Sequence, residues 1–183
     1  EPVYKLGPSY TDANQYLSLV RKSDDALSEF IAYFREVEEP VVVVFFGDHQ
    51  PSLSKEFYPI LNGKGSTGLS EEEMQKLVMV PCLILTNYDS PEQEVELTSL
   101  NYLSTMALEQ AGISLPPYYQ FLSDMQECIP AMNARSYYSK SLGTYQEFEY
   151  ATGEEAMWLH QYEMLQYNGM FDREHRSEVF YSY

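Results

Sequence analysis

Basic residues are scarce in this sequence of 183 residues. Lys and Arg together number 11 against 28 Asp and Glu, so the formal net charge is −17 at pH 7. Nucleic acids and anionic lipid surfaces are bound through clustered Lys and Arg, which neutralise phosphate charge. We therefore expect no nucleic-acid partner and no basic patch for a membrane surface. An anionic substrate would need a bound cation.

Cysteines and long apolar runs are scarce as well. Cys82 and Cys128 lie in different segments without zinc-type spacing, which excludes a disulfide framework and a zinc knuckle. We expect both thiols to be unpaired, with Cys82 pointing into the core as a small hydrophobe. No run reaches the roughly 18 apolar residues of a membrane span, and Glu1-Pro2 is neither an initiator methionine nor a signal peptide. The chain resembles part of a longer protein.

The remaining composition, 44% hydrophobic, is typical of a globular domain. Two continuous apolar runs, Val41 to Phe46 and Val80 to Thr86, indicate strands of one sheet that are covered on both faces. Helical periodicity is clearest in residues 12–37 and 98–111, and we expect these two helices to cover the two faces. Shorter or later helices are predicted at about 71–78, 114–130 and 153–171. The order of elements predicts an α/β fold with central buried strands.

Local signals mark where several elements begin and end. Thr11 or Asp12 is expected to cap the first helix, and Ser70 to Glu73, "SEEE", forms a capping box. Gly112 is placed to end a helix in the left-handed conformation, and Gly143 to sit in a hairpin. Residues 50–69 are expected to form a long loop.

Tyrosine is abundant, with 17 copies, and two interpretations remain open: packing in and around the core, or a surface that stacks on carbohydrate. The last predicted helix is expected to pack one face, which comprises Met157, Leu159 or His160, Met164, Leu165 and Tyr167.

The candidate chemistry lies at Asp48 and His49, which follow the first apolar run directly after Gly47. Functional residues of open α/β sheets collect beyond the carboxyl ends of strands, and carboxylate and imidazole are good ligands for zinc or manganese. Gly47 is expected to permit the sharp turn that brings both onto one ion. A Gly-Asp step is also ordinary turn chemistry, so a structural role remains an alternative. His160 and His175 are expected to be structural or solvated.

Other catalytic patterns are missing from the sequence: it contains no G-x-S-x-G elbow, no P-loop and no G-x-G-x-x-G fingerprint. Whatever chemistry the chain carries therefore runs through Asp48 and His49.

Five segments together carry a family resemblance over about residues 10 to 170. They are "YLSLVRKSDDAL", "VVVVFFGDHQPSL", "VPCLILTNYD", "SLNYLSTMALEQAGISLPPYYQFL" and "YEMLQYN". In this order they resemble the C-terminal part of the sulfatase-like catalytic domain of lipoteichoic acid synthases and related phosphoglycerol transferases. After the Asp-His pair those synthases continue with an aromatic residue and a glycine, whereas this chain continues with Gln50-Pro51-Ser52.

The resemblance implies a partial alkaline-phosphatase-like or sulfatase-like sandwich, with residues 1–183 as the C-terminal portion of one catalytic domain. It implies that Asp48 and His49 bind a divalent ion, Mn²⁺ in the synthases. The threonine nucleophile would lie upstream, so no catalytic nucleophile and no other cofactor site is expected in this chain, and the isolated chain would be inactive. The metal would lower the pKa of the nucleophile and neutralise phosphoryl charge.

The function implied is a metal-dependent phosphoglycerol transferase that acts on glycerol-phosphate polymers or lipids of the cell envelope. Its partners would be an anionic phosphoglycerol, sulfate-ester or phosphate-ester substrate and the upstream half of the same domain. Membrane helices outside this chain would tether it at the extracytoplasmic face of a bacterial membrane. The alternatives are a sulfuric-ester or phosphoester hydrolase, a phosphoethanolamine transferase, and a non-catalytic interaction module.

Overall fold

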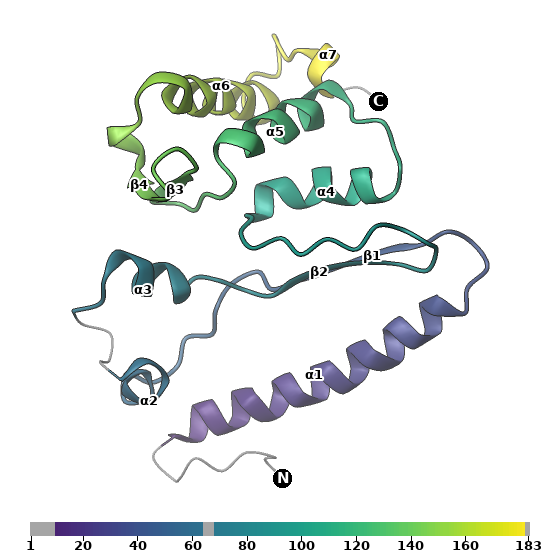
Figure 1. Ribbon diagram of the computed structural model, residues 1–183, viewed down its shortest axis with the longest axis vertical. Coiled ribbons are helices and arrows are strands. Elements are labelled where there is room, and N and C mark those ends of the chain that lie inside the picture. Colours follow the sequence, from purple (N-terminus) through teal and green to yellow (C-terminus); the bar gives the residue numbers. More distant parts are fainter. Residues whose placement is uncertain (1–9, 64–67, 182–183) are drawn as a thin grey trace. The chain divides into compact units, whose positions relative to one another are not determined.

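The computed structural model describes residues 10–63 and 68–181, and for Asn62 and Glu71 only the backbone. The chain divides into two compact units, Glu1–Asp89 and Ser90–Tyr183, and each is described by itself (Figure 1). Both units combine helices with small antiparallel sheets, so the predicted α/β class is confirmed. The assignment of residues 1–183 to one catalytic domain remains a prediction.

In its described residues, 10–63 and 68–89, the first unit contains two strands and three α-helices. Its elements in chain order are α1 (Thr11–Arg35), β1 (Val42–Phe46), α2 (Tyr58–Asn62), α3 (Glu71–Lys76) and β2 (Cys82–Thr86). The predicted loop 50–69 therefore includes a short helix, and its residues 64–67 lie outside the described part.

Strands β1 and β2 form an antiparallel ribbon in which Val44 lies opposite Ile84. Their predicted neighbourhood in one sheet is confirmed. The predicted burial is wrong, because Phe45, Phe46 and Leu83 are 37%, 47% and 40% exposed. In the part of the chain that the structure describes, each strand pairs with one neighbour, so each is an edge strand. A continuous apolar run indicates that both faces of a strand are suited to burial. It does not indicate that other parts of this chain cover those faces.

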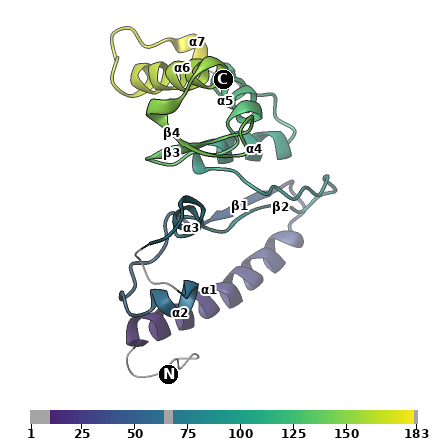
Figure 2. The same cartoon turned by 60° about the vertical axis from the view of Figure 1, so that its left-hand side comes forward.

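Helix α1 lies along one side of this ribbon (Figures 1 and 2). Its apolar stripe is only partly buried: Ala13 is fully covered, whereas Val20 and Phe30 remain 44% and 48% exposed. The predicted cap is also different, because Tyr10 occupies the N-cap position and no side chain caps the helix.

The short helix α3 begins as predicted. The Ser70 hydroxyl accepts a hydrogen bond from the Glu73 backbone N–H, and the Glu73 carboxylate accepts one from the Ser70 N–H. The two residues close a reciprocal capping box.

The second unit contains four helices, two 3₁₀ turns and a hairpin. Its elements in chain order are η2 (Leu100–Tyr102), α4 (Leu103–Gln110), α5 (Pro117–Cys128), β3 (Ser136–Ser139), β4 (Thr144–Glu147), η3 (Phe148–Tyr150), α6 (Gly153–Met170) and α7 (Glu178–Tyr181). The predicted Gly143 turn joins β3 to β4, and Gly112 ends α4 with φ +67°. Ile113 N–H then bonds back to the Leu108 carbonyl at 3.0 Å, as in a Schellman cap.

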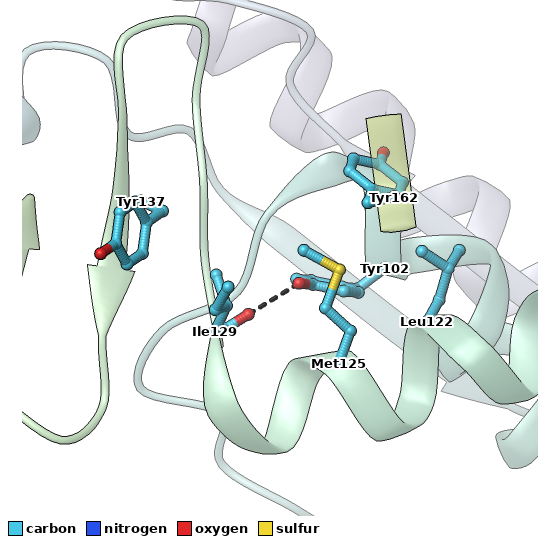
Figure 3. Packing of buried hydrophobic residues seen from close by; sticks show 6 residues of the cluster. All are labelled: Tyr102, Leu122, Met125, Ile129, Tyr137 and Tyr162. Atoms are coloured by element: carbon cyan, nitrogen blue, oxygen red, sulfur yellow. Dashed lines mark hydrogen bonds between the residues drawn. The ribbon is translucent and has the colours of Figure 1, made fainter. Parts of the chain in front are cut away.

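Aromatic side chains dominate the core of this unit (Figure 3). The buried residues of the cluster are Tyr102, Leu122, Met125, Ile129, Tyr137 and Tyr162. The Tyr102 hydroxyl donates a hydrogen bond to the Ile129 carbonyl at 2.7 Å, so its polar end is satisfied. Burial raises the pKa of Tyr102 far above its usual range. For these three tyrosines the packing interpretation is confirmed.

Helix α6 buries only part of the predicted face, because Leu159 packs against the core cluster whereas other predicted residues stay exposed. Glu155 and Tyr162 are buried, whereas Met157, Met164 and Tyr167 are 48%, 50% and 61% exposed. The apolar periodicity identified the helix correctly. Apolar residues occur on several sides of this helix, so periodicity alone does not select the buried side. The buried side is the one that carries Glu155 and its hydrogen bonds.

A buried carboxylate ties the hairpin to α6. Glu155 is 8% exposed and accepts hydrogen bonds from the hydroxyls of Tyr137 at 2.9 Å, Ser139 at 2.5 Å and Ser141 at 3.0 Å. Three donors compensate for the lost hydration of the carboxylate. No local pattern indicates this site, since Glu155 looks in the sequence like an ordinary acidic residue of a first helical turn.

Candidate metal-binding site

The candidate site begins where β1 ends, at Gly47. The Gly47 N–H donates to the Pro81 carbonyl at 3.0 Å, which continues the ribbon by one residue. Gly47 does not have a positive φ, so the turn does not require its conformational freedom. A Cβ atom at this position would lie 2.9 Å from Cβ of Val80. Gly47 is therefore needed for the close approach of the two chain segments.

Asp48 and His49 bring their ligand atoms together immediately after this glycine. Oδ2 of Asp48 lies 3.5 Å from Nε2 of His49, and the His49 backbone N–H donates to Oδ1 of Asp48 at 2.9 Å. The prediction that the two side chains converge is confirmed. Both side chains are largely exposed, at 82% for Asp48 and 78% for His49, so solvent and ligands reach them freely.

The imidazole of His49 is oriented by the following residue. Nδ1 of His49 lies 2.9 Å from the backbone carbonyl oxygen of Gln50. A carbonyl oxygen can only accept, so Nδ1 must carry the hydrogen in this bond. In the neutral ring Nε2 then has the free lone pair, and Nε2 is the nitrogen that faces Asp48.

This donor set fits one side of a divalent-metal site. Oδ2 of Asp48 and Nε2 of His49, 3.5 Å apart, are close enough to bind one ion together. The chemistry also fits, because neutral imidazole and carboxylate are ligands of zinc and manganese. Within residues 10–63 and 68–181, no group of three or more His, Cys, Asp or Glu side chains is arranged to hold an ion. Asp48 and His49 can therefore supply two ligands, and a complete coordination sphere needs others.

Two contacts over long sequence separations fasten the loop that follows the pair. The side-chain amide of Gln50 donates to the Met79 carbonyl, just before β2. Farther along, the Asp12 carboxylate accepts hydrogen bonds from the Ser54 backbone N–H at 2.5 Å and from its hydroxyl at 3.3 Å. The bond from the Ser54 N–H, together with one from Ala13, holds the pKa of Asp12 below its usual range. Sequence reasoning assigned Asp12 to a helix cap and missed both contacts.

The other residues considered from the sequence lie elsewhere. Cys82 is an exposed free thiol at the start of β2, opposite Phe46, so its predicted place in the core is wrong. Cys128 is a half-buried free thiol. His160 and His175 are exposed in the second unit, and His175 forms an ion-pair contact with Asp172 at 3.1 Å. Their predicted solvated role is consistent with this placement.

No helix among the described residues is long and apolar enough to cross a bilayer.

Comparison with known proteins places this arrangement in a family. Residues 7–113 match the family described as Sulfatase, and this match includes β1, Asp48, His49 and β2. Over 178 residues the chain is 25% identical to a protein of Rhizobium meliloti (strain 1021) that is named a cyclic beta-1,2-glucan modification protein. That alignment covers 91% of this chain and 26% of the relative, so the chain spans about a quarter of the length of that protein. No solved structure matches the chain significantly. Because the family match extends over more than half of the sequence, the chain belongs to the sulfatase family.

Proposed function

We propose that this chain supplies Asp48 and His49 to the divalent-metal centre of a phosphoglycerol transferase that modifies a cell-envelope glycan or glycerol-phosphate polymer. The observation that carries the proposal is the 3.5 Å approach of Asp48 Oδ2 to His49 Nε2 at a strand end, with the imidazole turned so that Nε2 is free to bind. A bound divalent ion would neutralise phosphoryl charge and activate a nucleophile. A chain of net charge −17 needs such an ion to accept an anionic substrate.

Membership in the sulfatase family supports hydrolysis or transfer of a sulfate or phosphate ester as the general chemistry. The choice of transfer rests on the resemblance to phosphoglycerol transferases. The name of the Rhizobium relative adds support for a glucan as acceptor. The lipid phosphodiester that we propose as donor of the phosphoglycerol group rests on the same resemblance to phosphoglycerol transferases. Mn²⁺ is the metal we propose, and the extracytoplasmic face of the membrane is the location.

The remaining ligands and the nucleophile come, on this proposal, from other parts of the same protein. Support comes from the open state of the ribbon: β1 and β2 each have a free edge within the described residues, and Phe46 and Leu83 are 47% and 40% exposed. A two-stranded ribbon alone is marginally stable, so additional strands and apolar cover would stabilise it. On this proposal, the parts of the protein that add strands to the ribbon would also bring the remaining metal ligands to Asp48 and His49.

The test compares this chain with a protein that contains it and the rest of the catalytic domain. Calorimetric titration with Mn²⁺ should show weak or no binding to residues 1–183, because two ligands leave most of the coordination sphere to water. Binding to the larger protein should be tight. In that protein, Asp48→Ala and His49→Ala should abolish turnover of a glycerol-phosphate diester.

His160→Ala is the matched control, since His160 is an exposed histidine of the second unit. It should leave metal binding and turnover unchanged. Full activity in the Asp48→Ala, His49→Ala double variant would show that the pair is structural, and the interaction-module alternative would then be preferred.

A further inference from the structure

The side chain of His49 is held in one orientation although it is 78% exposed. An exposed side chain normally samples several rotamers, and restricting it costs conformational entropy. Here Nδ1 bonds to the Gln50 carbonyl at 2.9 Å, and the His49 backbone N–H bonds to Asp48. The orientation of the ring therefore depends on how firmly the Gln50 carbonyl is placed.

Two independent constraints place that carbonyl. On one side, the Gln50 side-chain amide donates to the Met79 carbonyl, which fixes residue 50 against the segment that leads into β2. On the other side, the carbonyl belongs to the Gln50-Pro51 peptide, and the ring of Pro51 confines the preceding residue to extended backbone. The rotation that would carry this oxygen away from His49 is thus restricted.

The hydrogen bond also selects a tautomer. A neutral imidazole in water carries its hydrogen preferentially on Nε2, whereas the bond to the Gln50 carbonyl requires the hydrogen on Nδ1. Only the Nδ1–H form offers the Nε2 lone pair to an ion beside Asp48. The hydrogen bond to the Gln50 carbonyl therefore favours the Nδ1–H tautomer of His49, whereas water favours the Nε2–H tautomer.

We propose that Gln50 is a positioning residue for His49: its side chain, anchored on Met79, holds the carbonyl that keeps His49 in the Nδ1–H tautomer with Nε2 directed to the metal. The part that concerns the metal rests on the proposed function. The tautomer itself is a property of this chain without any ion, so the two can be tested separately.

The first measurement is a two-bond ¹H–¹⁵N correlation spectrum of the full 183-residue chain near pH 8, where histidines are mostly neutral. It distinguishes the protonated from the unprotonated ring nitrogen of each histidine. His49 should be an Nδ1–H tautomer, whereas the exposed His160 should show the Nε2–H form preferred in water. His160→Gln and His175→Gln variants assign the signals.

The second measurement uses Gln50→Leu, which keeps the size of the side chain and removes the donor to Met79. Gln120→Leu is the matched control, because Gln120 is an exposed glutamine whose amide also donates one hydrogen bond, to Asp124 at 2.9 Å. Gln50→Leu should shift His49 toward the Nε2–H form, and Gln120→Leu should not. In the protein that contains the whole catalytic domain, Gln50→Leu should weaken binding of Zn²⁺, used in these spectra as a diamagnetic substitute for the proposed Mn²⁺, about tenfold, the lower end of outer-shell effects.

An Nε2–H tautomer of His49 in the unsubstituted chain would overturn the inference, and this result needs no variant that might misfold. Retention of Nδ1–H in a folded Gln50→Leu chain would also overturn it, because Gln50 would then not set the ring. If the tautomer behaves as expected but Zn²⁺ leaves the His49 signals unchanged in the complete domain, the positioning of the ring stands. In that case the metal role of His49 and the proposed function fail together.

Discussion

Replacing Glu155 by alanine should strongly destabilise the second unit. Glu155 is buried, and its carboxylate accepts hydrogen bonds from two buried hydroxyls, those of Tyr137 and Ser139, at 2.9 and 2.5 Å. In Glu155→Ala the Tyr137 hydroxyl loses its partner in a site that water reaches poorly, and the Ser139 hydroxyl is left with the Ser141 hydroxyl at 3.1 Å. Each buried unsatisfied donor costs about 1–3 kcal/mol. The substitution also removes a carboxylate that is costly to bury, and this gain offsets part of the cost of the unsatisfied donors. We therefore expect a net loss of about 3 kcal/mol in the free energy of unfolding.

The matched control is Glu154→Ala. Glu154 also lies in the first turn of α6, where an acidic side chain interacts favourably with the helix dipole, but it is exposed. The indole N–H of Trp158 donates a long hydrogen bond of 3.4 Å to the Glu154 carboxylate. This control therefore removes the dipole contribution and a weak contact, and it should cost less than about 1 kcal/mol.

Urea unfolding followed by tryptophan fluorescence suits this comparison, since Trp158 is the single tryptophan of the sequence and lies in α6. A double-mutant cycle of Glu155→Ala with Tyr137→Phe should show a coupling of about 1 kcal/mol or more. Equal stability losses in Glu155→Ala and Glu154→Ala would refute the reasoning, because the buried hydrogen bonds would then contribute nothing beyond the dipole.

Three further predictions concern both units. Hydrogen bonds from Ser54 lower the pKa of Asp12 below 3.8. The ionised carboxylate of Asp12 therefore stabilises the fold above about pH 3.8, and this contribution is lost as the pH falls through the folded-state pKa. Asp12→Asn should therefore reduce stability at pH 7 and make little difference at pH 2 by circular dichroism; an equal effect at both pH values would contradict this. Burial and the Glu155 contact raise the pKa of Tyr137 to about 12, so stability present below pH 10 should be lost between pH 10 and 12. Absorbance at 295 nm should show a late ionisation phase that Tyr137→Phe reduces by one tyrosine, since Tyr102 also ionises late; an unchanged late phase in the variant would count against it. Gly47→Ala should destabilise the first unit by about 1–3 kcal/mol in urea unfolding, because its Cβ would lie 2.9 Å from that of Val80; unchanged stability would show that this segment adapts freely.

The sequence by itself determined the features whose causes lie within a few residues. The capping box at Ser70 and Glu73, the left-handed turn at Gly112 and the hairpin at Gly143 follow from local backbone preferences. The placement of Asp48 and His49 at a strand end follows from the abrupt end of an apolar run. Successive side chains of a strand point to opposite faces, so their approach to 3.5 Å was expected only if the backbone turns sharply after the strand.

Only the tertiary structure decided which surfaces and side chains meet. Asp12 bonds to Ser54 across 42 residues, and Gln50 bonds to Met79 across 29, and no local pattern specifies either pairing. The inward turn of Glu155 depended on the hydroxyls that the hairpin brings to it. Apolar periodicity reports how much of a surface can be buried, but it does not identify the partner. That choice depends on how separate elements pack, because hydrogen-bond partners and complementary shapes far apart in sequence must be satisfied together.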